Sequence, residues 1–392
     1  MSLDDFNNDS YRQLCEFYMK QLKISCFQCL CREMHGCYPL MIQRLIKATG
    51  IKCEPCELHR TFYGWNTPLI TPPFPHIIDG DWRYSTPTTA RLIDFAHRSQ
   101  GRTAACIHLG SPSTYKTALA SFPGTGYHYL YDRNALLHRV NNFIPPAFSG
   151  FDVAFLDPPW YKDETYLFLR IASDMLSSDG IALVAQPSIL TRPNVQIERY
   201  KFLEFARSLG FLLIGELKNF LRYETPHFEY VTLKKTLRIP VPSDWRTGDL
   251  IVLSLTRKSK IINDSIECSY EREWIEKCVG PVRFMIREVD DFPPFYPINS
   301  DCVARSVSRR DILKEKVGVW TSGNRIFGCN SVDDTLIILS QFNLLLRRCE
   351  LKKSTVTKIL IDSGLDEACA LVSSQSIVED MMEHLQHGYG SV

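Results

Sequence analysis

Short apolar runs alternate with amphipathic stretches through the middle of the chain. The apolar runs have the length of strands buried in a sheet, and the stretches between them show helical periodicity. The runs predict strands at Ala104–Leu109, His128–Asp132, Val153–Asp157, Ile181–Gln186, Phe211–Leu217, Phe228–Leu233 and Asp249–Arg257. The predicted helices include Thr88–His97, Thr165–Leu176 and Gln196–Ser208. This alternation predicts an α/β fold with a doubly wound, Rossmann-like sheet.

The two ends of the chain have different patterns from this middle part. Near the N-terminus, a cysteine-rich region contains two amphipathic stretches, Tyr11–Leu22 and Leu40–Ala48, which are compatible with a helix-turn-helix or a zinc-bound module. Near the C-terminus, a polar turn and a helical stretch at Val332–Leu346 predict a small mixed or helical domain. We therefore predict three domains, at residues 1–64, 77–258 and 301–392.

Composition narrows the functional classes. Hydrophobic residues make up 45% and charged residues 23% of the 392 positions, which is typical of a globular protein. The net charge of +1 gives no overall attraction to nucleic acid, so such a surface would have to be local, for example the basic stretch Arg305–Lys358. No apolar run has membrane-spanning length, and residues 1–5 do not resemble a secretory signal. We therefore expect no membrane association and a cytoplasmic location, or a nuclear one in a eukaryote.

The most distinctive sequence is Asp157-Pro158-Pro159-Trp160, which directly follows the apolar run Val153–Leu156. The prolines end the strand and fix the backbone beyond it. In an open α/β sheet, ligands bind outside the carboxyl ends of the strands. A carboxylate, a rigid carbonyl and an aromatic plane at this place can hold a planar group that carries an amine. The alternative is a strand that ends in a proline-rich turn.

Two further predicted strands also end in residues suited to a ligand. After Ala104–Leu109, Gly110 would let the backbone approach a ligand and Ser113 would cap the next helix. The usual glycine-rich fingerprint is absent here, so an ordinary strand–helix turn is an equal alternative. The acid Asp132 ends His128–Asp132, where a carboxylate can accept hydrogen bonds from both ribose hydroxyls of a nucleoside cofactor. A surface aspartate is the alternative for that position.

Together these motifs resemble those of the N6-adenine methyltransferase-like superfamily, which uses S-adenosylmethionine. The Asp157-Pro158-Pro159-Trp160 sequence is similar to the superfamily signature. Asp81-Trp82-Arg83-Tyr84-Ser85 and the Gly110–Tyr115 loop resemble one branch, which also contains lysine methyltransferases of elongation factor 1-alpha. Trp160 departs from the tyrosine or phenylalanine usual in that branch and is typical of messenger-RNA adenine methylases. The resemblance covers roughly residues 77–235.

The resemblance implies a Rossmann-like methyltransferase domain that transfers a methyl group to nitrogen. The implied catalytic residues are Asp157, Pro158, Pro159 and Trp160. The implied cofactor-binding residues are Tyr84, Gly110, Ser111, Pro112, Ser113, Asp132 and Asp157. The implied substrate-binding residues are Tyr161, Arg222 and Phe228. The leading interpretation is N6-methylation of adenine in RNA or DNA. The alternatives are methylation of lysine in a protein substrate, and a binding scaffold whose methyltransferase fold has lost activity.

The fourteen cysteines need a separate interpretation. Without a secretory signal, they indicate reduced thiols or metal ligands rather than disulfides. The paired Cys-x-x-Cys motifs Cys26/Cys29 and Cys53/Cys56 are a candidate structural zinc site. The further candidate ligands are Cys31, Cys37, His35 and His59. The alternative is that these cysteines are buried apolar side chains of a helix.

Overall fold

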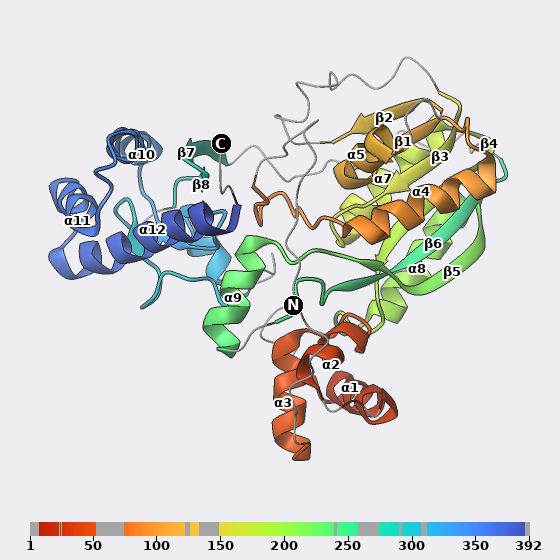
Figure 1. Cartoon of the computed structure of the whole chain (residues 1–392), viewed down its shortest axis with the longest axis horizontal. Coiled ribbons are helices and arrows are strands. Elements are labelled where there is room, and N and C mark those ends of the chain that lie inside the picture. Colours follow the sequence, from red (N-terminus) through yellow and green to blue (C-terminus); the bar gives the residue numbers. More distant parts are fainter. Residues whose placement is uncertain are drawn as a thin grey trace.

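A computed structural model describes most of the chain between residues 8 and 388. The segments it does not describe within these limits are 23, 25, 52–73, 122–125, 133–148, 239–240, 258–273, 290–291 and 307–311. The middle of the chain forms one sheet, the C-terminal part forms a second sheet with its own helices, and a group of N-terminal helices packs beside them (Figure 1).

The central sheet has six strands in the order β2-β1-β3-β4-β6-β5. The strands are β1 (Cys106–Leu109), β2 (His128–Tyr131), β3 (Phe151–Leu156), β4 (Leu176–Pro187), β5 (Phe211–Arg222) and β6 (Thr247–Leu255). Strands β1 to β4 pair in parallel, whereas β6 runs antiparallel to both of its neighbours. This is the predicted Rossmann-like sheet, with one antiparallel strand inserted near its edge.

Helices cover both faces of this sheet (Figure 1). They are α4 (Thr86–Gln100), α5 (Pro112–Ser121), α7 (Lys162–Met175) and α8 (Val195–Ser208). Successive residues of a strand point to opposite faces, so Ala154 packs in the core under α7 and α8, and Phe155 packs in the core under α4 and α5. Because β1, β3, β4 and β6 are buried on both faces along most of their length, these strands read as apolar runs, which is why they were predictable.

One predicted strand is wrong: Phe228–Leu233 belongs to helix α9 (His227–Leu237). Pro226 occupies the position before the helix with an extended backbone. Phe228 is buried against the C-terminal domain, and Leu233 is buried against the N-terminal helices. A helix buried on several sides carries a continuous apolar run, and periodicity does not distinguish such a run from an internal strand.

The N-terminal region contains three helices, α1 (Asp9–Leu22), α2 (Phe27–Glu33) and α3 (Pro39–Thr49). Helix α2 lies between the two predicted helices in the sequence, so α1 and α3 are not joined by a short turn as the helix-turn-helix prediction required. Helix α3 ends at Gly50, which adopts the left-handed backbone conformation common at helix ends. The three helices share a core with Leu233 of α9 and with Trp245.

The C-terminal part is built on an antiparallel sheet in the order β7-β8-β10-β11-β9. Its strands are β7 (Ile275–Val279), β8 (Val282–Ile286), β9 (Tyr296–Pro297), β10 (Val319–Thr321) and β11 (Ile326–Gly328). Strands β7 and β8 come from a segment in which the sequence predicted none. The helices α10 (Val332–Arg347), α11 (Lys353–Asp362) and α12 (Glu367–Gly388) pack with this sheet. A short 3-10 helix, Ile312–Lys316, lies before β10.

Residues 74–83, here named the connecting segment, join the C-terminal part to the central sheet. Its Ile77 and Ile78 pack in one core with Phe228 and Trp320. In the same segment, the ring of His76 makes a hydrogen bond of 3.0 Å with the backbone oxygen of Trp320. The C-terminal sheet therefore fixes the path of a segment that leads directly into α4. Among the helices described, none combines the length and the apolar character that crossing a bilayer requires.

Candidate functional site

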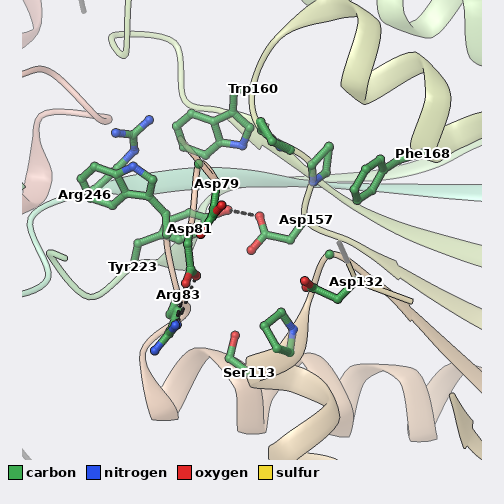
Figure 2. A pocket seen from close by; sticks show the side chains of 16 residues that line it. Asp79, Asp81, Arg83, Ser113, Asp132, Asp157, Trp160, Phe168, Tyr223 and Arg246 are labelled. Carbon is green, nitrogen blue, oxygen red and sulfur yellow. Dashed lines mark hydrogen bonds and ion pairs between the residues drawn. The ribbon is translucent and has the colours of Figure 1, made fainter. Parts of the chain in front are cut away.

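A pocket of about 160 Å³ lies at the carboxyl ends of β1, β2 and β3 (Figure 2). This is the edge of the sheet at which ligands bind in open α/β folds. Figure 2 shows Asp157 in the middle, with Asp132 and Phe168 on one side, Trp160, Tyr223 and Arg246 on the other, and Ser113 below. The lining residues come from the strand ends, the connecting segment, the start of α5, α7, and the loop before β6.

Many of the residues singled out in the sequence meet in this pocket. Those that line it are Gly110, Pro112, Ser113, Asp132, Asp157, Pro158, Pro159 and Trp160. Ser111 does not line it, because its hydroxyl is buried against Thr114 at 2.8 Å. Tyr84 lies just behind the lining, where its ring packs on Tyr223 with a centroid separation of 4.8 Å. Tyr161 is outside the lining and occupies the N-cap position of α7.

The other two predicted substrate residues lie elsewhere. Arg222 makes an ion pair of 3.2 Å with Glu33 of helix α2, so its guanidinium faces the N-terminal helices rather than the pocket. Phe228 is completely buried, and its ring meets that of Trp82 edge to face at 5.9 Å. Phe228 therefore supports a wall of the pocket from behind and has no surface with which to touch a substrate.

Several lining residues were not identified from the sequence. They are Asp79, Gly80, Asp81, Trp82, Arg83, Phe168, Tyr223 and Arg246. A weak signal existed for Asp81, Trp82 and Arg83. They belong to the segment 81–85, which resembles a methyltransferase motif, but the resemblance implied a binding role only for Tyr84. Arg246 had no local signal, because only the pairing of β6 with β4 brings the residues before β6 to the pocket.

The carboxyl group of Asp157 is held by aromatic hydroxyls in a poorly hydrated environment. The Tyr223 hydroxyl donates a hydrogen bond of 2.9 Å to Asp157 Oδ1. Burial raises the pKa of Asp157 well above its usual range, and nearby Asp81 adds to this rise. Hydrogen bonds from Tyr223 and Tyr84, together with the charge of Arg246, oppose the rise. Asp157 is thus a carboxyl group whose charged form depends on two tyrosine hydroxyls.

Gly110 allows the loop after β1 to pass close to Asp157. Its φ of +57° belongs to the left-handed region that favours glycine. A Cβ atom at this position would fall 2.6 Å from the ring of Phe168 and 3.2 Å from the backbone oxygen of Asp157. The Gly110 N–H donates a hydrogen bond of 2.8 Å to the backbone oxygen of Tyr131, next to Asp132. Gly110 therefore brings the ends of three neighbouring strands together.

Two tryptophans enclose a guanidinium on the opposite side of the pocket. The central carbon of Arg246 lies 4.0 Å from the ring centroid of Trp82 and 4.6 Å from that of Trp160. Such cation–π contacts are stronger when the cation is partly desolvated. Trp160 is further fixed by its backbone oxygen, which accepts a hydrogen bond of 2.6 Å from Arg192. Gly248 leaves room for this ring, because a Cβ there would lie 3.1 Å from it.

The connecting segment contributes paired charges to the pocket wall. Arg83 forms a two-pronged ion pair with Asp81, at 2.5 Å and 3.1 Å. Asp79 lies 2.7 Å from a guanidinium nitrogen of Arg283 on β8. Each of these two carboxylates is therefore neutralised by an arginine, and the second pair ties the pocket to the C-terminal sheet.

The proposed cysteine zinc site lies partly outside the described residues, because Cys53, Cys56 and His59 belong to a segment that is not described. Cys26 is buried next to the start of α2, and Cys29 within α2 is half-buried. Cys37 is completely buried with its sulfur 3.8 Å from that of Cys15. The pKa of Cys37 is raised well above its ordinary value, mainly by burial and secondarily by the neighbouring Cys15 thiol. This is expected of a thiol packed in a core. The predicted alternative ligand His35 hydrogen-bonds to Asn219 instead.

Comparison with known proteins gives structural neighbours but no family. No protein-family model and no curated protein matches the sequence. A branched-chain polyamine synthase from Thermus thermophilus is 14% identical, with a TM-score of 0.47 over 66% of this chain and 91% of that chain. A candidate RNA methyltransferase from Pyrococcus horikoshii is 16% identical, with a TM-score of 0.31 over 47% and 94%. A TehB-like SAM-dependent methyltransferase from Corynebacterium glutamicum is 15% identical, with a TM-score of 0.25 over 43% and 88%.

Proposed function

We propose that this protein is an S-adenosylmethionine-dependent N-methyltransferase and that its leading substrate is adenine in RNA or DNA. The observation that carries this proposal is the arrangement around Asp157-Pro158-Pro159-Trp160. The motif follows β3 at the ligand-binding edge of the sheet, with Asp132 on one side and the Trp82–Arg246–Trp160 group on the other. The two sides offer the contacts that a nucleoside cofactor and a planar amine require.

On the cofactor side, the acceptor and the close backbone approach come from neighbouring strands. Asp132 follows β2 and would accept hydrogen bonds from the ribose hydroxyls, as an acid does in dinucleotide sites. Gly110, Pro112 and Ser113 follow β1 and would pass beside the cofactor, which only the missing side chain of Gly110 permits. Phe168 adds an apolar wall. When bound, S-adenosylmethionine would supply a methyl group already activated by its sulfonium.

On the substrate side, the protein would orient a nitrogen and stabilise the charge that develops on it. Asp157 and the backbone oxygen of Pro158 would accept hydrogen bonds from the N6 amino group of adenine. These acceptors favour the positive charge that the nitrogen gains as it takes the methyl group. Trp160 would stack on the base, a contact that contributes about 1–3 kcal/mol in single-stranded nucleic acid recognition. A base within a duplex would first have to flip out.

A second candidate substrate is a lysine side chain, for which Asp132 and Asp157 are the relevant carboxyl groups of the pocket. The other two lining carboxylates, Asp79 and Asp81, are paired with arginines. Carboxylates attract an ammonium group and would also hold the neutral amine that attacks the methyl group. The indoles of Trp82 and Trp160 would then enclose the aliphatic stem, as aromatic side chains do for cationic amines.

A labelling experiment separates these substrates. The full chain is supplied with methyl-labelled S-adenosylmethionine and, separately, with total RNA, total DNA and total protein. The proposal predicts label in a nucleic-acid pool, which digestion releases as N6-methyladenosine or its deoxy form. Label found only in protein, as methyl-lysine, would transfer the assignment to the second candidate. Failure to label any pool, combined with absence of cofactor binding, would leave the fold as a binding scaffold.

Asp132→Ala is expected to weaken cofactor binding by roughly tenfold or more, because it removes a charged acceptor of hydrogen bonds that each contribute about 1.5–3 kcal/mol. The KM for the nucleic-acid or protein substrate should change much less. Fluorescence or calorimetric titration of the cofactor measures the effect, with the exposed Asp163→Ala on α7 as control. Equal cofactor affinity in both variants would remove Asp132 from the site.

Tyr223→Phe is expected to move the acid limb of the pH–activity profile to higher pH. Its hydroxyl donates to Asp157 Oδ1, and this hydrogen bond lowers the pKa of a carboxyl group that burial has raised. Without it, Asp157 stays protonated to higher pH and accepts less well from the substrate amine. On the acid limb the rate should fall about tenfold, since hydrogen bonds to charged groups contribute about 1.5–3 kcal/mol. The exposed Tyr200→Phe is the control, and superimposable profiles would contradict the assigned role.

A further inference from the structure

A second group of buried polar side chains lies outside the pocket, where α9 meets α12 and the turn between β10 and β11. It consists of His227 at the start of α9 and of Asp380 and His384 on α12, here named the His–Asp–His cluster. At most 9% of each residue is exposed. One ligand atom from each residue lies within 4.8 Å of the other two. Two imidazoles and a carboxylate are a ligand set used by divalent transition metals such as zinc.

The hydrogen bonds of His384 leave one ring nitrogen suited to a metal. Its Nδ1 lies 2.8 Å from the backbone oxygen of Asp380, one turn earlier in the helix. A carbonyl oxygen only accepts, so Nδ1 carries a proton in this hydrogen bond, and in the neutral imidazole Nε2 then keeps its lone pair. Nε2 points to the hydroxyl of Ser322 at 2.7 Å. Histidines that bind metals usually have this arrangement, in which the other ring nitrogen donates to a backbone carbonyl.

Asp380 has one oxygen engaged and one that remains for a ligand. Its Oδ2 accepts a hydrogen bond from the Thr321 hydroxyl at 2.5 Å. Its Oδ1 lies 3.1 Å from His384 Nδ1, at ion-pair distance, and accepts no geometrically defined hydrogen bond among the described residues. Leaving a buried carboxylate oxygen without a hydrogen bond is costly. A metal ion would satisfy it.

The neighbouring turn fixes the position of Asp380. A Cβ atom at Gly323 would fall 1.6 Å from Asp380 Oδ1, so only a glycine lets this carboxylate lie against the turn. The ring of Phe74 covers His384 with a centroid separation of 4.6 Å. Arg325, a buried cation near Asp380, is neutralised by Glu383 at 3.0 Å. The cluster is thus enclosed and offers a carboxylate that the adjacent arginine does not occupy.

From these observations we infer that the His–Asp–His cluster binds one divalent transition-metal ion, zinc in the first instance. His227 and His384 would each give an imidazole nitrogen and Asp380 would give Oδ1, with the Ser322 hydroxyl or water at the remaining position. Asp380 and His384 are one helical turn apart on α12, whereas His227 belongs to the domain of the central sheet. The ion would therefore fasten α9 to α12. His227 is four residues beyond Tyr223, so the ion would also help to fix a wall of the pocket.

The test uses the full chain after treatment with a chelator. Calorimetric titration with zinc is compared for the wild type, Asp380→Asn, His384→Gln and a Cys26→Ser/Cys29→Ser double variant. The inference predicts one equivalent of zinc that the double cysteine variant retains. Asp380→Asn and His384→Gln should bind that equivalent roughly 100-fold more weakly or not at all. Loss of the zinc in the cysteine variant but not in the cluster variants would overturn the inference, as would the absence of any binding.

A spectroscopic measurement covers the case in which the cluster variants fail to fold. Cobalt is added to the double cysteine variant, which keeps the cluster intact. A cobalt ion held by nitrogen and oxygen shows visible d–d bands without the intense thiolate-to-metal band of a cysteine site. That spectrum, with cobalt displaced by zinc, is the expected result. A thiolate band, or no cobalt spectrum, would contradict a site built from His227, Asp380 and His384. Neither measurement depends on methyltransferase activity.

Discussion

Replacing Asp157 with asparagine is expected to reduce methyl transfer by about 10²–10⁴-fold, the range typical of losing a positioned electrostatic or acid–base group. The amide oxygen can still accept the hydrogen bond that Tyr223 donates at 2.9 Å, so the wall of the pocket should stay in place. The variant lacks the negative charge of Asp157, which would stabilise the positive charge that develops on the substrate nitrogen during methyl transfer. Single-turnover rates with labelled cofactor measure the effect.

The same variant should unfold at a temperature equal to or above that of the wild type. Burial raises the pKa of Asp157 in the folded chain, while in the unfolded chain it stays near about 3.9. Between these two values the folded chain binds more protons, so its stability falls as the pH rises through this window. Asparagine has no proton to lose, so the variant does not undergo this fall in stability. Its gain in stability over the wild type should be complete above the raised pKa of Asp157 and should vanish below about pH 4.

The exposed Asp163→Asn variant on α7 is the matched control for both measurements, and we expect it to resemble the wild type. Normal turnover in Asp157→Asn would refute the role of Asp157 in the reaction. A marked loss of stability at neutral pH would instead mean that Asp157 is a structural acceptor. Activity and stability moving in opposite directions is the signature expected of a functional carboxylate in an unfavourable environment.

Gly110→Ala is the second change with a large expected effect, because it closes the proposed cofactor side. The left-handed backbone costs an alanine roughly 1–2 kcal/mol. The added methyl group meets Phe168 at 2.6 Å, and overpacking of this kind costs about 1–3 kcal/mol more. If the loop shifts to relieve the contact, it moves away from the end of β2. We expect cofactor affinity to fall at least about tenfold, together with a lower unfolding temperature in calorimetry.

Gly50→Ala separates the cost of the left-handed backbone from the cost of the steric contact with Phe168. Gly50 has a similar left-handed φ of +68°, but a Cβ atom there would meet nothing within 4 Å. This control should therefore show the backbone cost alone and normal cofactor binding. If the two variants bind cofactor equally well, the close approach of Gly110 to Phe168 and Asp157 has no part in the site.

The strand ends of the site were predictable because buried parallel strands leave a clear pattern. Strands β1 and β3 read as buried apolar runs and β2 as a short aromatic run, and the residues that follow them lie at one edge of the sheet. Asp157 and Asp132 could therefore be placed together from the order of residues alone. The helix α9 could not be predicted in the same way. Its run from Phe228 to Leu233 packs against both neighbouring regions, and total burial conceals the helical period.

The side of the pocket formed by Trp82, Arg246 and Trp160 could not be predicted, because it is built from residues that are far apart in the sequence. Trp82 and Arg246 meet only because the connecting segment and the loop before β6 converge beside Trp160. Asp79 is held through Arg283, on a β8 strand that the sequence did not reveal. The sequence assigned a substrate role to Arg222 and none to its neighbour Tyr223, yet in the fold Tyr223 reaches Asp157 and Arg222 turns away to Glu33. Such long-range positions leave no local pattern to read.

The central claim is that the pocket around Asp157 binds S-adenosylmethionine, and titration of this cofactor into the full chain by calorimetry tests it most directly. The account predicts one equivalent of binding to the wild type, weakened in Asp132→Ala and Gly110→Ala and unchanged in Gly50→Ala. A folded chain that binds no S-adenosylmethionine, or that binds it equally well in all four proteins, would contradict the account.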